Sequence, residues 1–159
     1  MINDNAIQDS ELTQVDASTG TWSENSEACE NLQHDHFIEE DGVRFAGHHL
    51  IVDFWGASNL DCIVTMEKAM RDAVEQAKAT LLHIHLHHFT PNGGVSGVAV
   101  LAESHISVHT WPEFGFAAFD VFMCGDSKPA KAIEVLESYF KPATNKVKDL
   151  KRGNVGGEL

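Results

Sequence analysis

Residues 80–102 read TLLHIHLHHFTPNGGVSGVAVLA, and this stretch decides the fold. Over residues 80–89 apolar and polar side chains alternate, as they do in a strand with one buried side. The two predicted faces carry three aliphatic and three imidazole side chains, respectively Leu82, Ile84 and Leu86, and His83, His85 and His87. Residues 91–94 are a turn sequence, and residues 95–102 form a second β-rich run. The stretch therefore predicts two antiparallel strands joined by a short turn.

Two helices are predicted outside this stretch. The first covers residues 60–78 after a cap at Ser58 or Asn59, and the second opens at Ser127 and stops at Lys141. In both, apolar side chains recur every three or four residues, which marks a helix face that packs on a core. These side chains are Leu60, Ile63, Met66, Met70, Ala73 and Ala77 in the first helix, and Ile133, Leu136 and Phe140 in the second.

Four more strands are predicted, at residues 48–55, 105–110, 116–123 and 146–150. The order β-α-β-β-β-β-α-β predicts an α+β fold, a two-layer sandwich in which a mainly antiparallel sheet has two helices on one face. The other face of such a sheet stays open to water unless something packs on it. We therefore expect a homodimer that joins the sheets face to face in an αββα arrangement.

The negative charge is concentrated near the N-terminus. The 159 residues carry 24 acidic and 11 basic side chains, and eleven of the acids but only one base, Arg44, lie within residues 1–44. Low hydrophobicity combined with high charge is typical of disorder. We expect an acidic, disordered N-terminal extension at residues 1–43, one folded domain at residues 44–153 and a flexible C-terminus at residues 154–159.

The composition also argues against several classes of protein. A net charge of −13 disfavours binding to nucleic acid or to an anionic membrane surface. No apolar run approaches the roughly 20 residues of a membrane span, and no secretory signal is visible. The cysteines, Cys29, Cys62 and Cys124, contain no C-x-x-C pair, which favours a reducing cytoplasm over a disulfide framework or a zinc ribbon.

The alternating histidines are one candidate for chemistry. His83, His85 and His87 share one face of a predicted strand, and metals use such a geometry. No carboxylate or cysteine lies at a matching spacing, so we predict no metal site. A non-catalytic, His-rich metal-binding protein remains as an alternative function.

A second candidate is the segment at residues 103–113, which reads ESHISVHTWPE. If it is extended, His105, Ser107 and His109 share one face. A serine with a nearby histidine base is the minimum for an activated nucleophile. The G-x-S-x-G sequence of α/β-hydrolases is absent from the chain, which disfavours that class.

Residues 87–125 read HHFTPNGGVSGVAVLAESHISVHTWPEFGFAAFDVFMCG. This segment closely resembles the short-form prokaryotic S-adenosylmethionine decarboxylase proenzymes, which are pyruvoyl-dependent. The motifs Val-Ser-Gly-Val, Glu-Ser-His, His-Thr-Trp-Pro-Glu and Cys-Gly stand in the order and at the spacing of that family, and the likeness extends over residues 48–152.

The resemblance implies a self-cleaving enzyme. It places the cleavage between Glu103 and Ser104 and identifies Ser104 as the residue that becomes the pyruvoyl group, which holds the substrate as a Schiff base. His109 matches the histidine that serves processing, Ser96 the hydroxyl that assists it, and Cys124 the proton donor in decarboxylation. The fragments would be residues 1–103 and 104–159, assembled as a homodimer of cleaved protomers.

The resemblance also implies the substrate, S-adenosylmethionine. Phe89 stands at the position of the aromatic ring that stacks on adenine, and Glu113 at that of the carboxylate that binds the ribose hydroxyls. Phe114 and Phe116 are further candidates for contact with the cationic substrate. The products would be S-adenosylmethioninamine, which supplies spermidine biosynthesis, and CO2. Relatives on this scaffold act on other amino acids, so ornithine or arginine is the alternative substrate.

The chemistry of cleavage can be argued from the residues themselves. The Ser104 hydroxyl can attack the preceding carbonyl through a five-membered ring, which is an intramolecular step with a large effective molarity. The resulting ester leaves more readily than an amide when the α-proton of Ser104 is removed. An imidazole such as that of His109 is suited to remove it, because histidine titrates near neutral pH.

Overall fold

The structure is a computed structural model that describes residues 36–155. Its elements are β1 (Ile38–Glu40), β2 (Val43–Trp55), α1 (Ile63–Gln76), β3 (Leu81–His88), β4 (Val95–Leu101), β5 (Ser104–Trp111), the 3₁₀ helix η1 (Pro112–Phe114), β6 (Phe116–Met123), α2 (Pro129–Phe140) and β7 (Thr144–Asn154). The predicted strands and helices are all present within these bounds. β2 and β7 are longer than expected, and β1 was not predicted.

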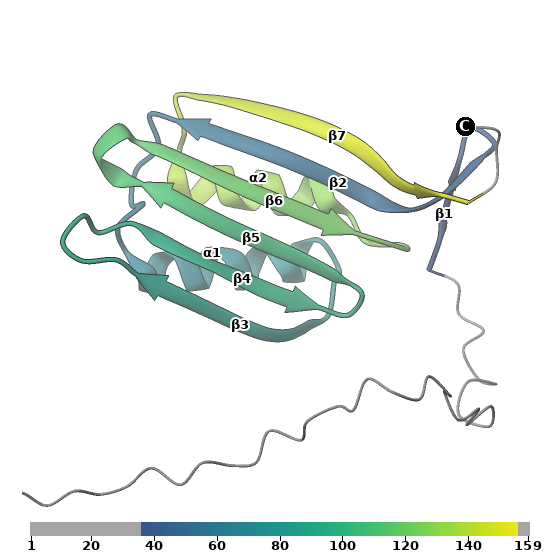
Figure 1. Ribbon diagram of the computed structural model, residues 1–159, viewed down its shortest axis with the longest axis horizontal. Helices are drawn as coiled ribbons and strands as arrows, with labels where there is room; N and C mark the ends of the chain where they lie inside the picture. Colours follow the sequence, from purple (N-terminus) through teal and green to yellow (C-terminus); the bar gives the residue numbers. More distant parts are fainter. Residues whose placement is uncertain (1–35, 156–159) are drawn as a thin grey trace, which may run out of the picture. The chain divides into compact units, whose positions relative to one another are not determined.

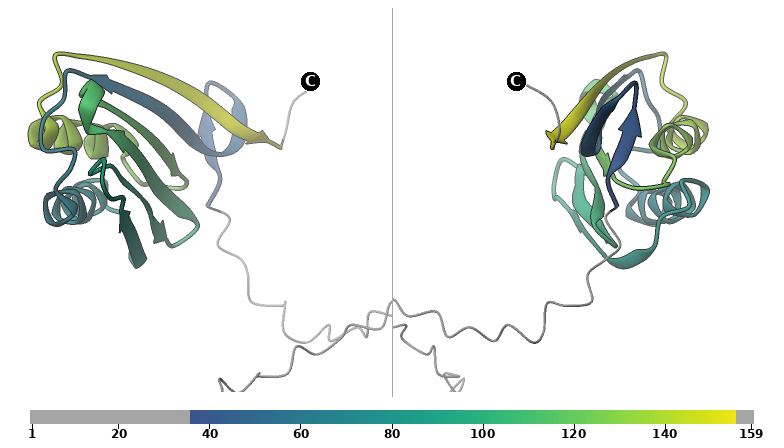
Figure 2. Two further views of the ribbon diagram at one scale, coloured as in Figure 1. Left: turned by 60° about the vertical axis from the view of Figure 1, so that its left-hand side comes forward. Right: turned by 90° about the vertical axis from the view of Figure 1, so that its right-hand side faces the viewer.

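The strands form one seven-stranded sheet in the order β1-β2-β6-β5-β4-β3, with β7 also paired to β2 (Figure 1). Every pair in it is antiparallel. Both helices lie on the same face of the sheet, and the opposite face carries no helix (Figure 2). The predicted α+β sandwich is therefore confirmed, whereas the structure holds one chain and does not test the dimer.

The core lies between the helices and the sheet. Both helices bury the predicted apolar stripe, and Phe54 and Phe119, whose ring centroids lie 5.3 Å apart, meet it from β2 and β6. The fully buried large side chains of this core include Met66, Met70, Leu136, Phe140, Val52, Ile106 and Met123. Among residues 36–155, no helix is long and apolar enough to cross a bilayer.

The open face of the sheet is formed by the alternate residues of each strand. In β5 and β6, cross-strand partners on this face are His105 and Phe122, Ser107 and Asp120, and Trp111 and Phe116. The indole rings of Trp55 and Trp111 flank the ring of Phe116, with centroids 5.7 and 5.3 Å away. Trp55 and Trp111 are 40% and 41% exposed, so large aromatic surface faces outward here.

The alternation predicted for β3 holds for Ile84 and Leu86, which pack against the core. It was wrong for Leu82, which is 64% exposed. The pairing of β3 with β4 is irregular between Leu81 and His83. This irregularity shifts the face of the strand by one residue, so that Leu81 contacts the core in place of Leu82.

The predicted cap of the first helix was also wrong. Helix α1 starts after Cys62, and no side chain caps it. The hydroxyl of Ser58 instead donates to the carbonyl of Phe140 at 3.1 Å, and the amide of Asn59 donates to the carbonyl of Tyr139 at 3.3 Å. Both side chains therefore satisfy the end of α2, where carbonyl groups lack helical partners.

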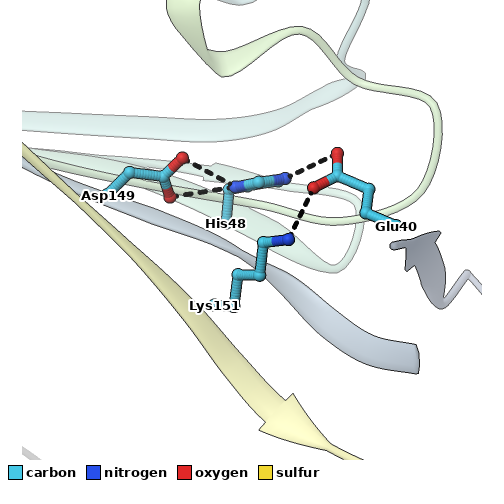
Figure 3. Close-up of polar contacts among 4 residues, drawn as sticks. All are labelled: Glu40, His48, Asp149 and Lys151. Atoms are coloured by element: carbon cyan, nitrogen blue, oxygen red, sulfur yellow. Dashed lines mark hydrogen bonds and ion pairs between the residues drawn. The ribbon is translucent and has the colours of Figure 1, made fainter. Parts of the chain in front are cut away.

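The folded part begins earlier than the predicted boundary at residue 44. Strand β1, inside the expected disordered extension, pairs with the start of β2. Figure 3 shows what holds it: the Glu40 carboxylate lies 3.3 Å from Nε2 of His48 and 2.9 Å from Nζ of Lys151, and Asp149 holds the other ring nitrogen of His48. The predictions for residues 1–35 and 156–159 lie outside the described residues, while Asn154, placed in the flexible C-terminus, belongs to β7.

Candidate active site

The predicted cleavage site lies in the tight turn between β4 and β5. Leu101 and Ser104 are cross-strand partners, so only Ala102 and Glu103 form the turn. Glu103 has a φ of +59°, in the left-handed region that residues other than glycine rarely occupy. Ser104 follows as the first residue of β5 and is only 8% exposed. The bond between Glu103 and Ser104 thus joins a strained turn residue to a buried strand residue.

Cys124 contacts both residues of this bond. It follows the last residue of β6, and its backbone N–H donates to Oγ of Ser104 at 3.3 Å. Its sulfur lies 3.5 Å from Oγ of Ser104 and donates to the Glu103 carbonyl oxygen, also at 3.5 Å. Cys124 therefore contacts both the Ser104 hydroxyl and the Glu103 carbonyl.

A second group of predicted residues lies around a cavity of about 370 Å³. Phe89, Ser96, His109 and Glu113 all line it. Ser96 and His109 are cross-strand partners in β4 and β5, and Oγ of Ser96 is hydrogen-bonded to Nδ1 of His109 at 2.9 Å. When Nδ1 carries the proton and donates to Ser96, Nε2 is left with the lone pair that a base requires.

The seven predicted site residues therefore form two groups, not one. Ser104 and His109 are the first and sixth residues of β5, and both side chains cannot reach one point within one chain. A strand rises ~3.3 Å per residue, so the two residues are separated by roughly 17 Å. Glu103, Ser104 and Cys124 lie at one end of the strand, and the cavity with His109 lies at the other.

His105 stands next to Ser104 in sequence, but its side chain lies on the open face of the sheet. Its ring stacks on Phe122, with centroids 5.7 Å apart, and lies 6.1 Å from the ring of His49. Burial lowers the pKa of His105 from its usual value near 6.5, the positive charge of His49 lowers this pKa further, and Asp120 opposes the change. The side chain of His105 therefore lies on the open face and points away from the predicted cleavage site.

Sequence reasoning missed two residues of these sites. Trp111 lines the cavity with His109, and their ring centroids lie 6.4 Å apart. The alternation of β5 could have found it, because residues 107, 109 and 111 share a face. His36 lies 3.7 Å from the Glu103 carboxylate, but it falls in an acidic stretch with no apolar period that could have pointed to it.

The structure gives no support to the metal-binding alternative. His83, His85 and His87 are exposed on β3. Within the described range, 36–155, no group of three or more histidine, cysteine, aspartate or glutamate side chains is arranged to hold a metal ion.

Comparisons with known proteins agree with the motifs. The sequence profile of a family described as S-adenosylmethionine decarboxylase matches residues 48–153. A protein of Thermomicrobium roseum named S-adenosylmethionine decarboxylase proenzyme is 46% identical over 114 residues, which cover 71% of this chain and 98% of that protein. A protein of the same name from Methanococcus maripaludis is 48% identical over 110 residues, which cover 67% and 89%.

One solved structure is similar over the same region. The crystal structure of the adenosylmethionine decarboxylase from Aquifex aeolicus is 34% identical, with a TM-score of 0.66. The match covers 72% of this chain and 97% of that chain. His36 and β1 precede residue 48, where the match to the family profile begins.

Proposed function

The chain belongs to the S-adenosylmethionine decarboxylase family, and we propose that it cleaves itself between Glu103 and Ser104 and then decarboxylates S-adenosylmethionine. The observation that carries this proposal is the contact among Ser104, Cys124 and the Glu103 carbonyl at a strained hairpin turn. A buried hydroxyl, the bond that it attacks and a half-buried thiol donor lie together. These residues suit a pyruvoyl group made from Ser104.

Cleavage starts at the Ser104 hydroxyl. Its oxygen attacks the carbonyl carbon of Glu103, the peptide C–N bond breaks, and an ester forms with a free amine on residue 104. The Cys124 thiol, 3.5 Å from the Glu103 carbonyl oxygen, is placed to donate to the negative charge that develops there. Relief of the left-handed φ of Glu103 favours the same step.

A base must then remove the α-proton of Ser104. The electrons of that C–H bond form a double bond between Cα and Cβ of residue 104. This step expels the backbone carboxylate of Glu103, which becomes the end of the first fragment. The resulting enamine tautomerises to an imine, and water converts the imine to the ketone and releases ammonia. His109, oriented by Ser96, is the base that we assign to this step.

In decarboxylation, the pyruvoyl ketone supplies an electron sink for the bond that is broken when CO2 leaves. The chain's own residues bind the substrate and move one proton. Cys124 lies next to residue 104 and is placed to deliver a proton to carbon.

The cavity around His109 suits the nucleoside part of S-adenosylmethionine. Phe89 is 48% exposed, and its ring packs edge-on against His87 with the centroids 4.6 Å apart, so its open side can stack on a purine or attract a sulfonium. Glu113, exposed in η1, can accept hydrogen bonds from two ribose hydroxyls. An ornithine or arginine substrate has no purine to stack on Phe89 and no ribose hydroxyls to bind Glu113.

A dimer would join the two groups of residues. A two-fold axis that lies between two stacked sheets and crosses β5 at right angles near Ser107 would bring the backbone at Ser104 of one copy over the partner subunit's His109, while the Ser104 side chain points to the helices. The open face of the sheet offers the surface for this contact, because it exposes Trp55 and Trp111. We therefore assign each complete site to two subunits of a homodimer.

The product would carry the aminopropyl group that spermidine biosynthesis needs. The described cysteines, Cys62 and Cys124, are both free thiols, which fits a cytoplasmic enzyme.

The proposal is tested by mass and by turnover. Mass spectrometry of the purified protein should show fragments of residues 1–103 and 104–159, the second with a ketone in place of its terminal amine. An uncleaved chain, or a fragment that begins with an ordinary serine, would reject the cleavage. Carboxyl-labelled S-adenosylmethionine should release CO2, and release from ornithine or arginine instead would reject the substrate.

A further inference from the structure

His36, two residues before β1, lies beside the proposed cleavage site. The carbonyl of His36 accepts a hydrogen bond from the backbone N–H of Gly125 at 2.9 Å, and Gly125 directly follows Cys124. The ring of His36 packs so closely on Gly125 that an added Cβ there would lie 3.3 Å from Nδ1 of His36. His36 is therefore fixed against the loop that carries the catalytic thiol.

The imidazole of His36 faces Glu103. Its Nε2 lies 3.7 Å from Oε2 of the Glu103 carboxylate, and the same carboxylate oxygen lies 3.7 Å from the sulfur of Cys124. His36, Glu103 and Cys124 together line a cavity of about 310 Å³, whose other walls include Thr80 and Ala102. The Glu103 side chain is thus held between His36 on one side and Cys124 on the other.

The segment that follows His36 is anchored. Strand β1 pairs with β2, and Glu40 at its end binds His48 and Lys151 (Figure 3). The guanidinium of Arg44 lies 5.0 Å from the centre of the Phe37 ring. These contacts hold the backbone of residues 36–40, so that replacing the imidazole of His36 alone leaves the segment attached.

We propose that His36 is a positioning residue for self-cleavage, which holds the Glu103 side chain so that the Glu103 carbonyl stays within reach of Ser104 and Cys124. Glu103 has a strained φ of +59°, and an unheld turn residue can relax to an ordinary conformation. Such relaxation would rotate the carbonyl away from both side chains. The inference rests on the proposed cleavage between Glu103 and Ser104, and it assigns a role to a residue that precedes the region matched by the family profile.

The full chain is made by cell-free translation, and its cleavage is followed over time. Mass spectrometry measures the fraction of the chain that remains uncleaved. His36→Ala should slow cleavage by roughly two- to fivefold, the range that an exposed ion pair supports. His36→Lys, which gives the Glu103 carboxylate a cationic partner, should recover most of the rate. Glu39→Ala, in the same segment, leaves the contacts of His36 in place and should cleave at the original rate. Processed enzyme with His36→Ala should keep its kcat for decarboxylation.

A double-mutant cycle separates positioning from a structural effect. In a Glu103→Gln background, His36→Ala should have little further effect, because the residue through which it acts has lost its charge. An equal slowing in both backgrounds, or an unchanged or faster rate for His36→Ala in the original chain, would overturn the inference. If the unmodified chain itself stays uncleaved, the proposed cleavage is wrong. This result differs from failure of the role of His36, in which the unmodified chain cleaves and His36→Ala cleaves equally fast.

Discussion

The Oγ atom of Ser104 lies 3.5 Å from the Sγ atom of Cys124, although the two residues are 20 positions apart in the chain. They meet because β5 begins where the antiparallel neighbour β6 ends, with His105 opposite Phe122. The hairpin turn between β4 and β5 therefore places the bond between Glu103 and Ser104 next to Cys124, the residue that follows β6. Strand register alone assembles this end of the sheet.

Ser104→Ala should abolish cleavage and leave the fold intact. The methyl group cannot attack the Glu103 carbonyl, and the main loss in stability is one hydrogen bond from the Cys124 N–H, worth about 1 kcal/mol. Mass spectrometry should show a single uncleaved chain, and the circular dichroism spectrum should be unchanged. Ser138→Ala is the matched control, since its hydroxyl donates to the Val135 carbonyl on α2, away from the open face, and should not affect cleavage. Cleavage of the Ser104→Ala chain at the same bond would remove Ser104 from the mechanism.

Cys124→Ala should separate processing from catalysis. The chain should still cleave because Ser104 and its base remain, although more slowly, since the thiol no longer donates to the charge on the Glu103 carbonyl oxygen. It should decarboxylate about 10²- to 10⁴-fold more slowly without the proton donor. Cys62→Ala, which removes the exposed thiol at the start of α1, should affect neither cleavage nor decarboxylation. CO2 release by fully cleaved protein is the measurement, and undiminished turnover in Cys124→Ala would contradict the assignment.

The sequence predicted the two helices and most of the strands because their periodicity records which side is buried. Ile84 and Leu86 follow that rule, and Leu82 breaks it because the local irregularity in pairing leaves no mark on the alternation. Ser58 and Asn59 are good helix-capping residues, but their partners on α2 are about 80 residues away in the chain, where local patterns do not reach. The extent of β2 was missed because charged and small residues at its start are ordered by β1 and β7.

The site residues were predicted from motifs, and motifs carry no distances. The sequence did not reveal that Ser104 and His109 occupy opposite ends of one strand. It also did not reveal His36, since a histidine in an acidic stretch has no pattern that links it to Glu103. Both relationships depend on strand register and on long-range pairing.

His105 should make stability depend on pH. Burial, followed by the charge of His49, lowers the pKa of His105 in the folded protein, so the unfolded chain binds the proton first. The free energy of unfolding should therefore fall as pH drops below about 6.5. Thermal unfolding midpoints at about pH 8 and about pH 5.5 should differ less in His105→Gln than in the original protein. Equal differences in the two proteins would show that other groups cause the dependence.

Gly97→Ala should destabilise the pairing of β3 with β4. An added Cβ would lie 2.2 Å from the carbonyl oxygen of His85 and 2.8 Å from Cα of Leu86, and backbone atoms cannot move aside as a side chain can. We expect a loss of about 1–3 kcal/mol, measured by denaturant unfolding in the uncleavable Ser104→Ala chain. Val64→Ala, on the exposed side of α1, should stay within about 0.5 kcal/mol of the parent chain. If Gly97→Ala is as stable as the parent chain, β3 and β4 accommodate the added Cβ without loss of stability, and the prediction is wrong.

Two uncleavable variants should complement each other if each site is shared between subunits. A chain with His109→Ala keeps Ser104, and a chain with Ser104→Ala keeps His109, so a mixed dimer contains one complete site and one that lacks both groups. Coexpression with the Ser104→Ala chain should therefore cleave part of the His109→Ala chain, which mass spectrometry identifies because the two chains differ in mass. The Ser104→Ala chain should stay whole in the same sample. The separation of roughly 17 Å along β5 is the reason to expect this result. If the His109→Ala chain stays uncleaved in a sample where mixed dimers are shown to form, Ser104 must obtain its base from within its own chain, and the shared site would be wrong.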